Sequence, residues 1–122
     1  MAKRKDVNVI PTESVHKYEM LNPLLSSLYA EMKELSAKKQ DLILNKVKVT
    51  MINRILRQIK ELLRDQPTAE FIDLLDEETL PSNSDSVLVL SQYRSAMNQF
   101  HSRYYRRDLS DTSSRWHTDD EP

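Results

Sequence analysis

The sequence predicts an all-α fold, a compact bundle of about four helices with disordered termini. Two observations carry this prediction. The chain of 122 residues contains no glycine, the residue that tight hairpins and left-handed turns need most. Apolar residues recur at steps of three and four along most of the chain, which is the period of a helix with one buried face. A chain of this length fits a single domain with one modest core.

The chain divides into three predicted parts. Residues 1–11 form a flexible basic N-terminal segment, residues 12–107 form the helical domain, and residues 108–122 form a disordered acidic tail. The tail is polar and rich in Ser, Thr and Asp, but it contains the single tryptophan, Trp116. We expect the tail to stay loose unless Trp116 docks on the domain.

The first two predicted helices flank Asn22-Pro23. Thr12 or Ser14 caps a short helix that runs through Met20. Asn22-Pro23 then starts a new helix, because Asn is a good cap and Pro at the first helical position loses no needed hydrogen bond. The second helix carries one apolar stripe, formed by Leu25, Leu28, Met32 and Leu35.

The strongest pattern predicts a helix over 46–65, capped by Asn45. Its apolar residues repeat at three and four, namely Val49, Ile52, Ile55, Ile59 and Leu62. No glycine or proline interrupts the chain from Pro23 to Asp65, so one long helix is the alternative. We favour a break near 40–45, with Leu42-Ile43-Leu44 packed as a connection.

Two further helices complete the predicted bundle. Thr68 caps a short acidic helix, and the stretch 80–85 separates it from a last helix over about 84–107. The predicted core takes residues from every predicted helix after the first: Leu25, Leu28, Met32, Leu35, Ile52, Ile55, Ile59, Leu62, Phe71, Leu75, Leu90, Met97 and Phe100.

Charge is segregated along the chain, although the net charge is only −1. Residues 33–64 carry nine Lys or Arg against three acids, whereas residues 65–90 carry seven acids and no base. Residues 91–107 are basic again, and the tail is acidic. We favour an arrangement in which opposite charges face each other within the fold or across a dimer. The alternative is a basic surface for nucleic acid or for an acidic partner.

Several classes of function lack their sequence signature. Without glycine the chain has neither a P-loop nor a dinucleotide fingerprint, and without cysteine it has no thiolate metal site and no disulfide. No apolar run approaches the roughly 18 residues that span a bilayer. We therefore expect no cofactor, no metal and no membrane partner, and we expect the protein to be cytoplasmic.

One spacing has a catalytic interpretation. Arg94 and His101 lie seven residues apart on the last predicted helix, so their side chains point the same way. The segment Arg94-Ser95-Ala96-Met97-Asn98-Gln99-Phe100-His101 resembles the Arg-x(4–6)-His motif of HEPN-family ribonucleases. These are small all-helical proteins that commonly dimerise and cut RNA without a metal. The resemblance implies that His101 activates the ribose 2′-hydroxyl or protonates the leaving group, that Arg94 stabilises phosphate charge, and that Tyr104 assists.

The leading functional prediction is nevertheless a non-enzymatic helical module, an adaptor, regulator or inhibitor that binds another protein. The broad apolar faces of the two longest predicted helices predict a homo-oligomer, most simply a dimer. The HEPN-like ribonuclease and a nucleic-acid binder that uses the basic 33–64 segment are the alternatives. Arg and Tyr are enriched at protein interfaces, and the predicted interaction residues are basic or aromatic. They are Lys48, Arg54, Arg57, Lys60, Arg103, Tyr104, Arg106 and Arg107.

Overall fold

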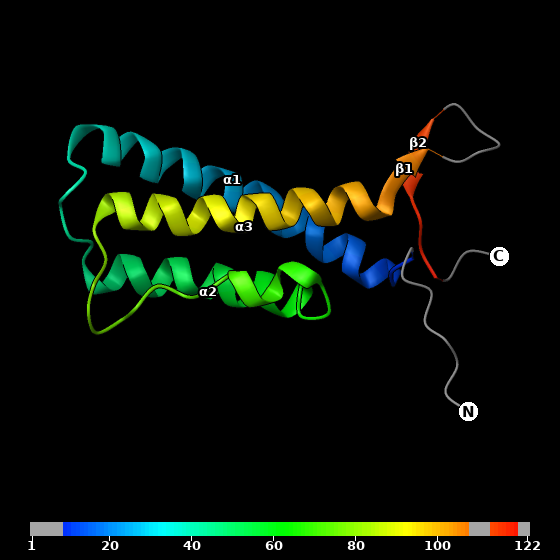
Figure 1. The fold of residues 1–122 in the computed structure, drawn as a ribbon, viewed down its shortest axis with the longest axis horizontal. Helices are drawn as coiled ribbons and strands as arrows, with labels where there is room; N and C mark the ends of the chain where they lie inside the picture. The colour runs from blue at the N-terminus through cyan, green and yellow to red at the C-terminus, as the bar shows by residue number, and fades with distance from the viewer. Residues whose placement is uncertain (1–8, 108–112, 120–122) are drawn as a thin grey trace.

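The computed structural model describes residues 9–107 and 113–119. In this part of the chain three α-helices, α1 (Thr12–Lys38), α2 (Lys46–Leu62) and α3 (Asn83–Tyr104), run side by side along the longest axis of the molecule (Figure 1). A 3-10 helix, η1 (Pro67–Phe71), follows α2, and two short strands, β1 (Tyr105–Arg107) and β2 (Ser114–Trp116), follow α3. The all-α prediction is confirmed in this coarse form, with three α-helices in the described residues rather than about four.

α1 is one continuous helix where the sequence predicts two. Pro23 lies inside it, although a proline within a helix removes a backbone hydrogen bond and crowds the preceding turn. The helix continues because its buried residues before and after the proline, such as Tyr18 and Leu25, belong to the same core cluster. The predicted boundary between Met20 and Asn22 is therefore wrong, since tertiary packing outweighs the local signal.

The predicted break between α1 and α2 is confirmed. α1 ends at Lys38 and α2 begins at Lys46, where the Asn45 side chain accepts a hydrogen bond of 2.8 Å from the Lys48 backbone N–H. Of the connection residues predicted to pack, Leu42 and Ile43 are exposed and only Leu44 is buried. The N–H of Leu44 donates to the carbonyl oxygen of Pro81 at 2.9 Å. This connection is thereby tied to the segment that precedes α3.

The predicted acidic helix after Thr68 is wrong. Only the single turn of η1 forms, and an irregular segment runs from Ile72 to α3. Two side chains of α2, Lys60 and Asn53, take the backbone groups of Ile72 and Leu75 that a helix would have used itself. Phe71, a predicted core residue, is consequently 65% exposed, whereas its neighbour Ile72 is buried at 1%.

α3 begins close to its predicted start and ends three residues before its predicted end. Ser82 caps it, since its hydroxyl accepts the N–H of Asp85 at 3.1 Å. After Tyr104 the backbone becomes extended and forms β1, which pairs antiparallel with β2 and places Arg106 opposite Arg115. The two short strands project beyond the end of α3, at the end of the bundle where α1 begins (Figure 1).

Both described ends of the chain pack on this end of the bundle. Ile10 forms a parallel bridge with Thr118, in which its N–H donates to the His117 carbonyl oxygen at 3.2 Å. The ring of Trp116 lies 5.2 Å from the ring of Tyr18, measured between centroids. The described part of the predicted tail, residues 113–119, thus docks on the domain through Trp116. Residues 1–8, 108–112 and 120–122 lie outside the described residues, with the parts of the predicted flexible segments that fall on them.

Most of the predicted core is buried. Eight predicted residues are fully enclosed, and Leu28, Leu35, Ile55 and Leu62 are partly exposed at its edge. The core also contains residues that lie near the chain ends or in the loop, for example Ile10 and Ile72. The eight confirmed positions are Leu25, Met32, Ile52, Ile59, Leu75, Leu90, Met97 and Phe100.

Tyr93 joins α3 to the segment that follows η1. The side chain is completely buried, and its hydroxyl donates a hydrogen bond of 2.8 Å to the carbonyl oxygen of Asp73. Burial raises the pKa of the Tyr93 hydroxyl well above its usual range, and the nearby Asp73 carboxylate raises this pKa further. The folded state therefore holds the neutral phenol.

We predict that Tyr93→Phe lowers the free energy of unfolding by about 1 kcal/mol at pH 7, the usual contribution of one hydrogen bond. Because the folded pKa is raised, the wild-type contribution is intact below the unfolded pKa of about 10 and is lost as the pH rises above it. Urea unfolding at pH 7 and above pH 10 measures both effects, with Tyr29→Phe as the control. The prediction fails if Tyr93→Phe and wild type lose equal stability between the two pH values.

Candidate functional site

Two sides of α2 have different neighbours. Thr50, Asn53 and Arg57 follow one another at steps of three and four, so they share one side of the helix. Met51, Ile55 and Gln58, spaced in the same way, share another side. The first side faces the acidic segment 72–78. The second side lines a surface next to α1, and Arg57 of the first side also borders this surface.

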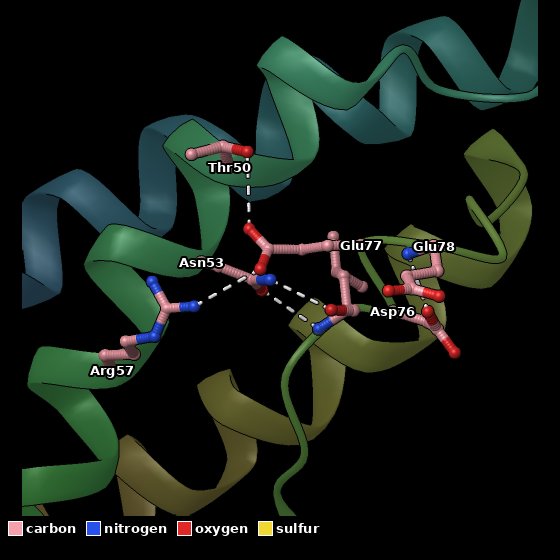
Figure 2. Close-up of polar contacts among 7 residues, drawn as sticks. Thr50, Asn53, Arg57, Asp76, Glu77 and Glu78 are labelled. Carbon is pink, nitrogen blue, oxygen red and sulfur yellow. Dashed lines mark hydrogen bonds and ion pairs between the residues drawn. The ribbon is translucent and has the colours of Figure 1, made fainter.

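Asn53 fixes the acidic segment to the first side. Its side-chain nitrogen donates to the Leu75 carbonyl oxygen at 2.9 Å, and its side-chain oxygen accepts the Leu75 N–H at 2.9 Å (Figure 2). Asn53 is 1% exposed, so both of these hydrogen bonds form away from water. The Asn53 amide therefore satisfies both backbone groups of Leu75, as a neighbouring strand would in a sheet.

We call the two hydrogen bonds between Asn53 and Leu75 the Asn53 clamp. Glu77 lies beside this clamp and contacts two residues on the same side of α2. A carboxylate oxygen accepts a hydrogen bond of 3.3 Å from the Thr50 hydroxyl, and the other oxygen lies 3.5 Å from an Arg57 guanidinium nitrogen (Figure 2). Arg57 and Glu77 are both partly solvated, so this ion pair contributes little free energy by itself. It places one acid of the segment against one base of α2, as the charge pattern predicts.

Asp76 forms its hydrogen bonds within the loop and not with α2. Its carboxylate accepts the backbone N–H groups of Glu78 at 2.8 Å and Thr79 at 2.9 Å. The hydrogen bond from Thr79, followed by that from Glu78, lowers the pKa of the Asp76 carboxyl. The side chain thus shapes the turn after Glu77, and within the described residues it forms no ion pair with a base of α2.

The second side of α2 forms an apolar groove with α1. A hollow of about 520 Å³ is lined by Met20, Leu24 and Met51 among others, and a second hollow of about 230 Å³ shares Met51 and extends toward Leu28 and Leu35. Met20, Leu24 and Met51 are 55%, 45% and 60% exposed. We call this surface the α1/α2 groove. Its lining residues are Met20, Leu21, Leu24, Leu28, Glu31, Met32, Leu35, Lys48, Met51, Ile52, Arg54, Ile55, Arg57 and Gln58.

Basic side chains dominate the charge of the groove. Lys48, Arg54 and Arg57 line it, and Glu31 is the one acidic lining residue. Arg57 is paired with Glu77. Among the described residues Lys48 and Arg54 have no ion pair. Arg54 follows Thr50 by four residues and so lies next to the side that Glu77 contacts. Lys48 shares its hollow with Glu31. Two positively charged side chains without an ion pair therefore border an exposed apolar surface.

The predicted interaction residues fall into two separate places. Lys48, Arg54 and Arg57 line the groove, whereas Lys60 turns away and donates to the Ile72 carbonyl oxygen at 2.6 Å. The other four lie where α3 ends and β1 begins, namely Arg103, Tyr104, Arg106 and Arg107.

Side chains at this second place are largely engaged within the chain. Tyr104 is buried and its hydroxyl accepts a hydrogen bond of 3.0 Å from Gln66. The guanidinium of Arg103 lies 5.7 Å from the centre of the Tyr104 ring, and Arg106 donates to the Arg103 carbonyl oxygen at 2.9 Å. Arg107 is exposed. This end of the molecule is thus stabilised by the same residue types that suggest an interface.

Arg94 and His101 lie on α3, each against aromatic rings from other parts of the chain. The Arg94 guanidinium is 4.3 Å from the centre of the Tyr29 ring on α1, a cation–π geometry. The His101 ring lies between aromatic neighbours, with centroid distances of 4.7 Å to Tyr105 and 5.3 Å to Trp116. The ribonuclease interpretation of these two residues stays a prediction.

Comparison with protein-family models, curated proteins and solved structures finds no match to this chain. Within residues 9–107 and 113–119, no group of three or more His, Cys, Asp or Glu residues is arranged to hold a metal ion. The helices of this same part of the chain are too short or too polar to cross a membrane.

Sequence reasoning missed the apolar half of the groove. Met20, Leu24 and Met51 stand next to core positions and widen the apolar stripes of their helices. Hydrophobicity alone does not distinguish these exposed residues from the buried core residues. The available signal was the width of the apolar faces, which predicted a further partner for the helices without locating it.

We predict that Asn53→Ala lowers the free energy of unfolding by about 3 kcal/mol, because it leaves the Leu75 N–H and carbonyl oxygen buried without partners. Urea unfolding monitored by circular dichroism measures the change. Gln58→Ala, an exposed residue on the same helix, is the matched control and is expected to change the value by less than about 0.5 kcal/mol. Equal effects of the two substitutions would contradict the clamp.

Proposed function

We propose that this protein is a non-enzymatic helical interaction module, and that it binds another protein through the α1/α2 groove. The observation that carries the proposal is the joint exposure of Met20, Leu24 and Met51 on two adjoining helices, around two hollows that share Met51. Contiguous exposed apolar surface favours association, and Met is enriched at interfaces because its side chain adapts to different partners.

The shape of the groove favours a helix as the bound element. From Met20 to Leu35 the α1 wall is about 22 Å long at the helical rise per residue. That length accommodates about four turns of a partner helix, whose residues at positions i, i+3, i+4 and i+7 enter the groove.

The expected homodimer supplies the competing occupant of the same groove. The exposed stripe of a second copy has the same chemistry as a partner helix, and a two-fold interface buries one patch on both copies. The proposal of a hetero-partner and the prediction of a dimer therefore make opposite demands on the solution mass of the purified protein.

We predict that the double substitution Leu24→Asp and Met51→Asp abolishes binding to the groove without unfolding the protein, because both side chains are largely exposed. The probe is an amphipathic helical peptide of about four turns with an apolar stripe and uncharged Gln flanks. An ¹⁵N-HSQC titration is expected to shift residues of α1 and α2 in wild type, and none in the double variant.

Leu88→Asp is the matched control, since Leu88 is an exposed leucine on α3, outside the groove lining. It is expected to bind the peptide like wild type. Shifts that map to α3 and are lost in Leu88→Asp would assign the binding to a different surface.

A further inference from the structure

We infer that the partner of the α1/α2 groove is an amphipathic helix with acidic residues on the flank that faces α2. This inference rests on the proposed function and adds the charge of the partner to it. Arg54 and Lys48 border the apolar lining on the α2 side, and in the described part of the chain neither has an ion pair.

The fold explains why these two bases stay available. Segment 65–90 carries seven acids, more than enough to neutralise α2. However, the Asn53 clamp holds residue 75 on the side of α2 opposite Met51, and the Glu77 carboxylate contacts Thr50 and Arg57. Glu77 therefore pairs with Arg57, which also lines the groove, while Lys48 and Arg54 line it without an ion pair.

The positions of the charges define the partner further. Lys48 and Arg54 are about 9 Å apart along the helix axis and about 120° apart around it, so they would meet acidic residues at two separate places along the partner helix. Glu31 lies on the α1 wall, so acidic residues on that flank of the partner would be repelled. The complementary helix is therefore acidic on one flank only, and its apolar stripe fills the hollows beside Leu24 and Met51.

A second copy of this chain fits the charges less well. In the described residues, the stripe that the chain itself would present is bordered by the same Lys48 and Arg54. Two copies that meet through this face bring two such pairs of bases into one interface, with a single Glu31 from each copy to offset them. Like charges brought together at an interface oppose association.

The test uses the full chain and three peptides of about four helical turns that share one apolar stripe. Their flanks carry Glu, Gln or Lys at the same positions, and fluorescence anisotropy at low salt gives the dissociation constants. We expect the Glu peptide to bind about tenfold more tightly than the Gln peptide, the Lys peptide to bind most weakly, and the preference to shrink as salt rises.

Charge-reversed variants assign the preference to the two bases. Lys48→Glu with Arg54→Glu is expected to reverse the order of the Glu and Lys peptides. Lys33→Glu with Arg107→Glu changes the net charge by the same amount at exposed positions that do not line the groove, and it should keep the wild-type order.

The outcomes separate the inference from the proposed function. Equal affinity for all three peptides, abolished by Leu24→Asp with Met51→Asp, overturns the acidic partner and leaves the groove as a binding site. A preference that survives Lys48→Glu with Arg54→Glu also overturns it. Absence of binding by every peptide contradicts the proposed function itself. A further outcome is a concentration-dependent dimer in sedimentation that the double substitution Leu24→Asp and Met51→Asp converts to monomer. This result would show that a second copy occupies the groove, and it too overturns the inference.

Discussion

The paired hydrogen bonds between the Asn53 side chain and the backbone of Leu75 are the constraint on which the rest of this structure depends. A buried amide that lacks either partner is costly, so the two groups specify one position of the loop along α2. With residue 75 fixed, Ile72 and Leu75 enter the core, and Tyr93 reaches the Asp73 carbonyl oxygen from α3. The loop thereby bridges α2 and α3, while α1 packs directly against both helices.

The same constraint gives α2 its unequal distribution of charge. Acidic residues that follow a basic helix in sequence can form ion pairs with any basic side chain of that helix within their reach. Here Glu77 contacts Thr50 and Arg57, while Lys48 and Arg54 border the apolar groove without an ion pair. The proposed function follows from this division, since a partner helix gains apolar burial and charge complementarity from one surface.

Local signals predicted the elements that local interactions determine. The cap at Asn45, the break before it and the apolar repeat of α2 are confirmed, because each involves neighbours within one or two turns. Pro23 and Thr68 misled the prediction, since packing of Tyr18 and Leu25 in one core carries α1 through the proline, and α2 side chains hold the loop extended. The Asn53–Leu75 pair spans 22 residues, so no local pattern announces it. Lys48 and Arg54 were predicted as interaction residues from their charge, whereas the exposure of Met51 depends on how α1 and α2 meet.

The most direct measurement of the central claim is a set of NMR nuclear Overhauser effects from the Glu77 side chain in the free, uniformly labelled protein. The structure predicts cross-peaks to the side chains of Thr50 and Arg57 and none to Lys48, which lies on the opposite side of α2 from Thr50. That result would place the acidic segment away from Lys48. Cross-peaks from Glu77 to Lys48, or none to Arg57, would mean that the acidic segment takes another position along α2, and would contradict the account.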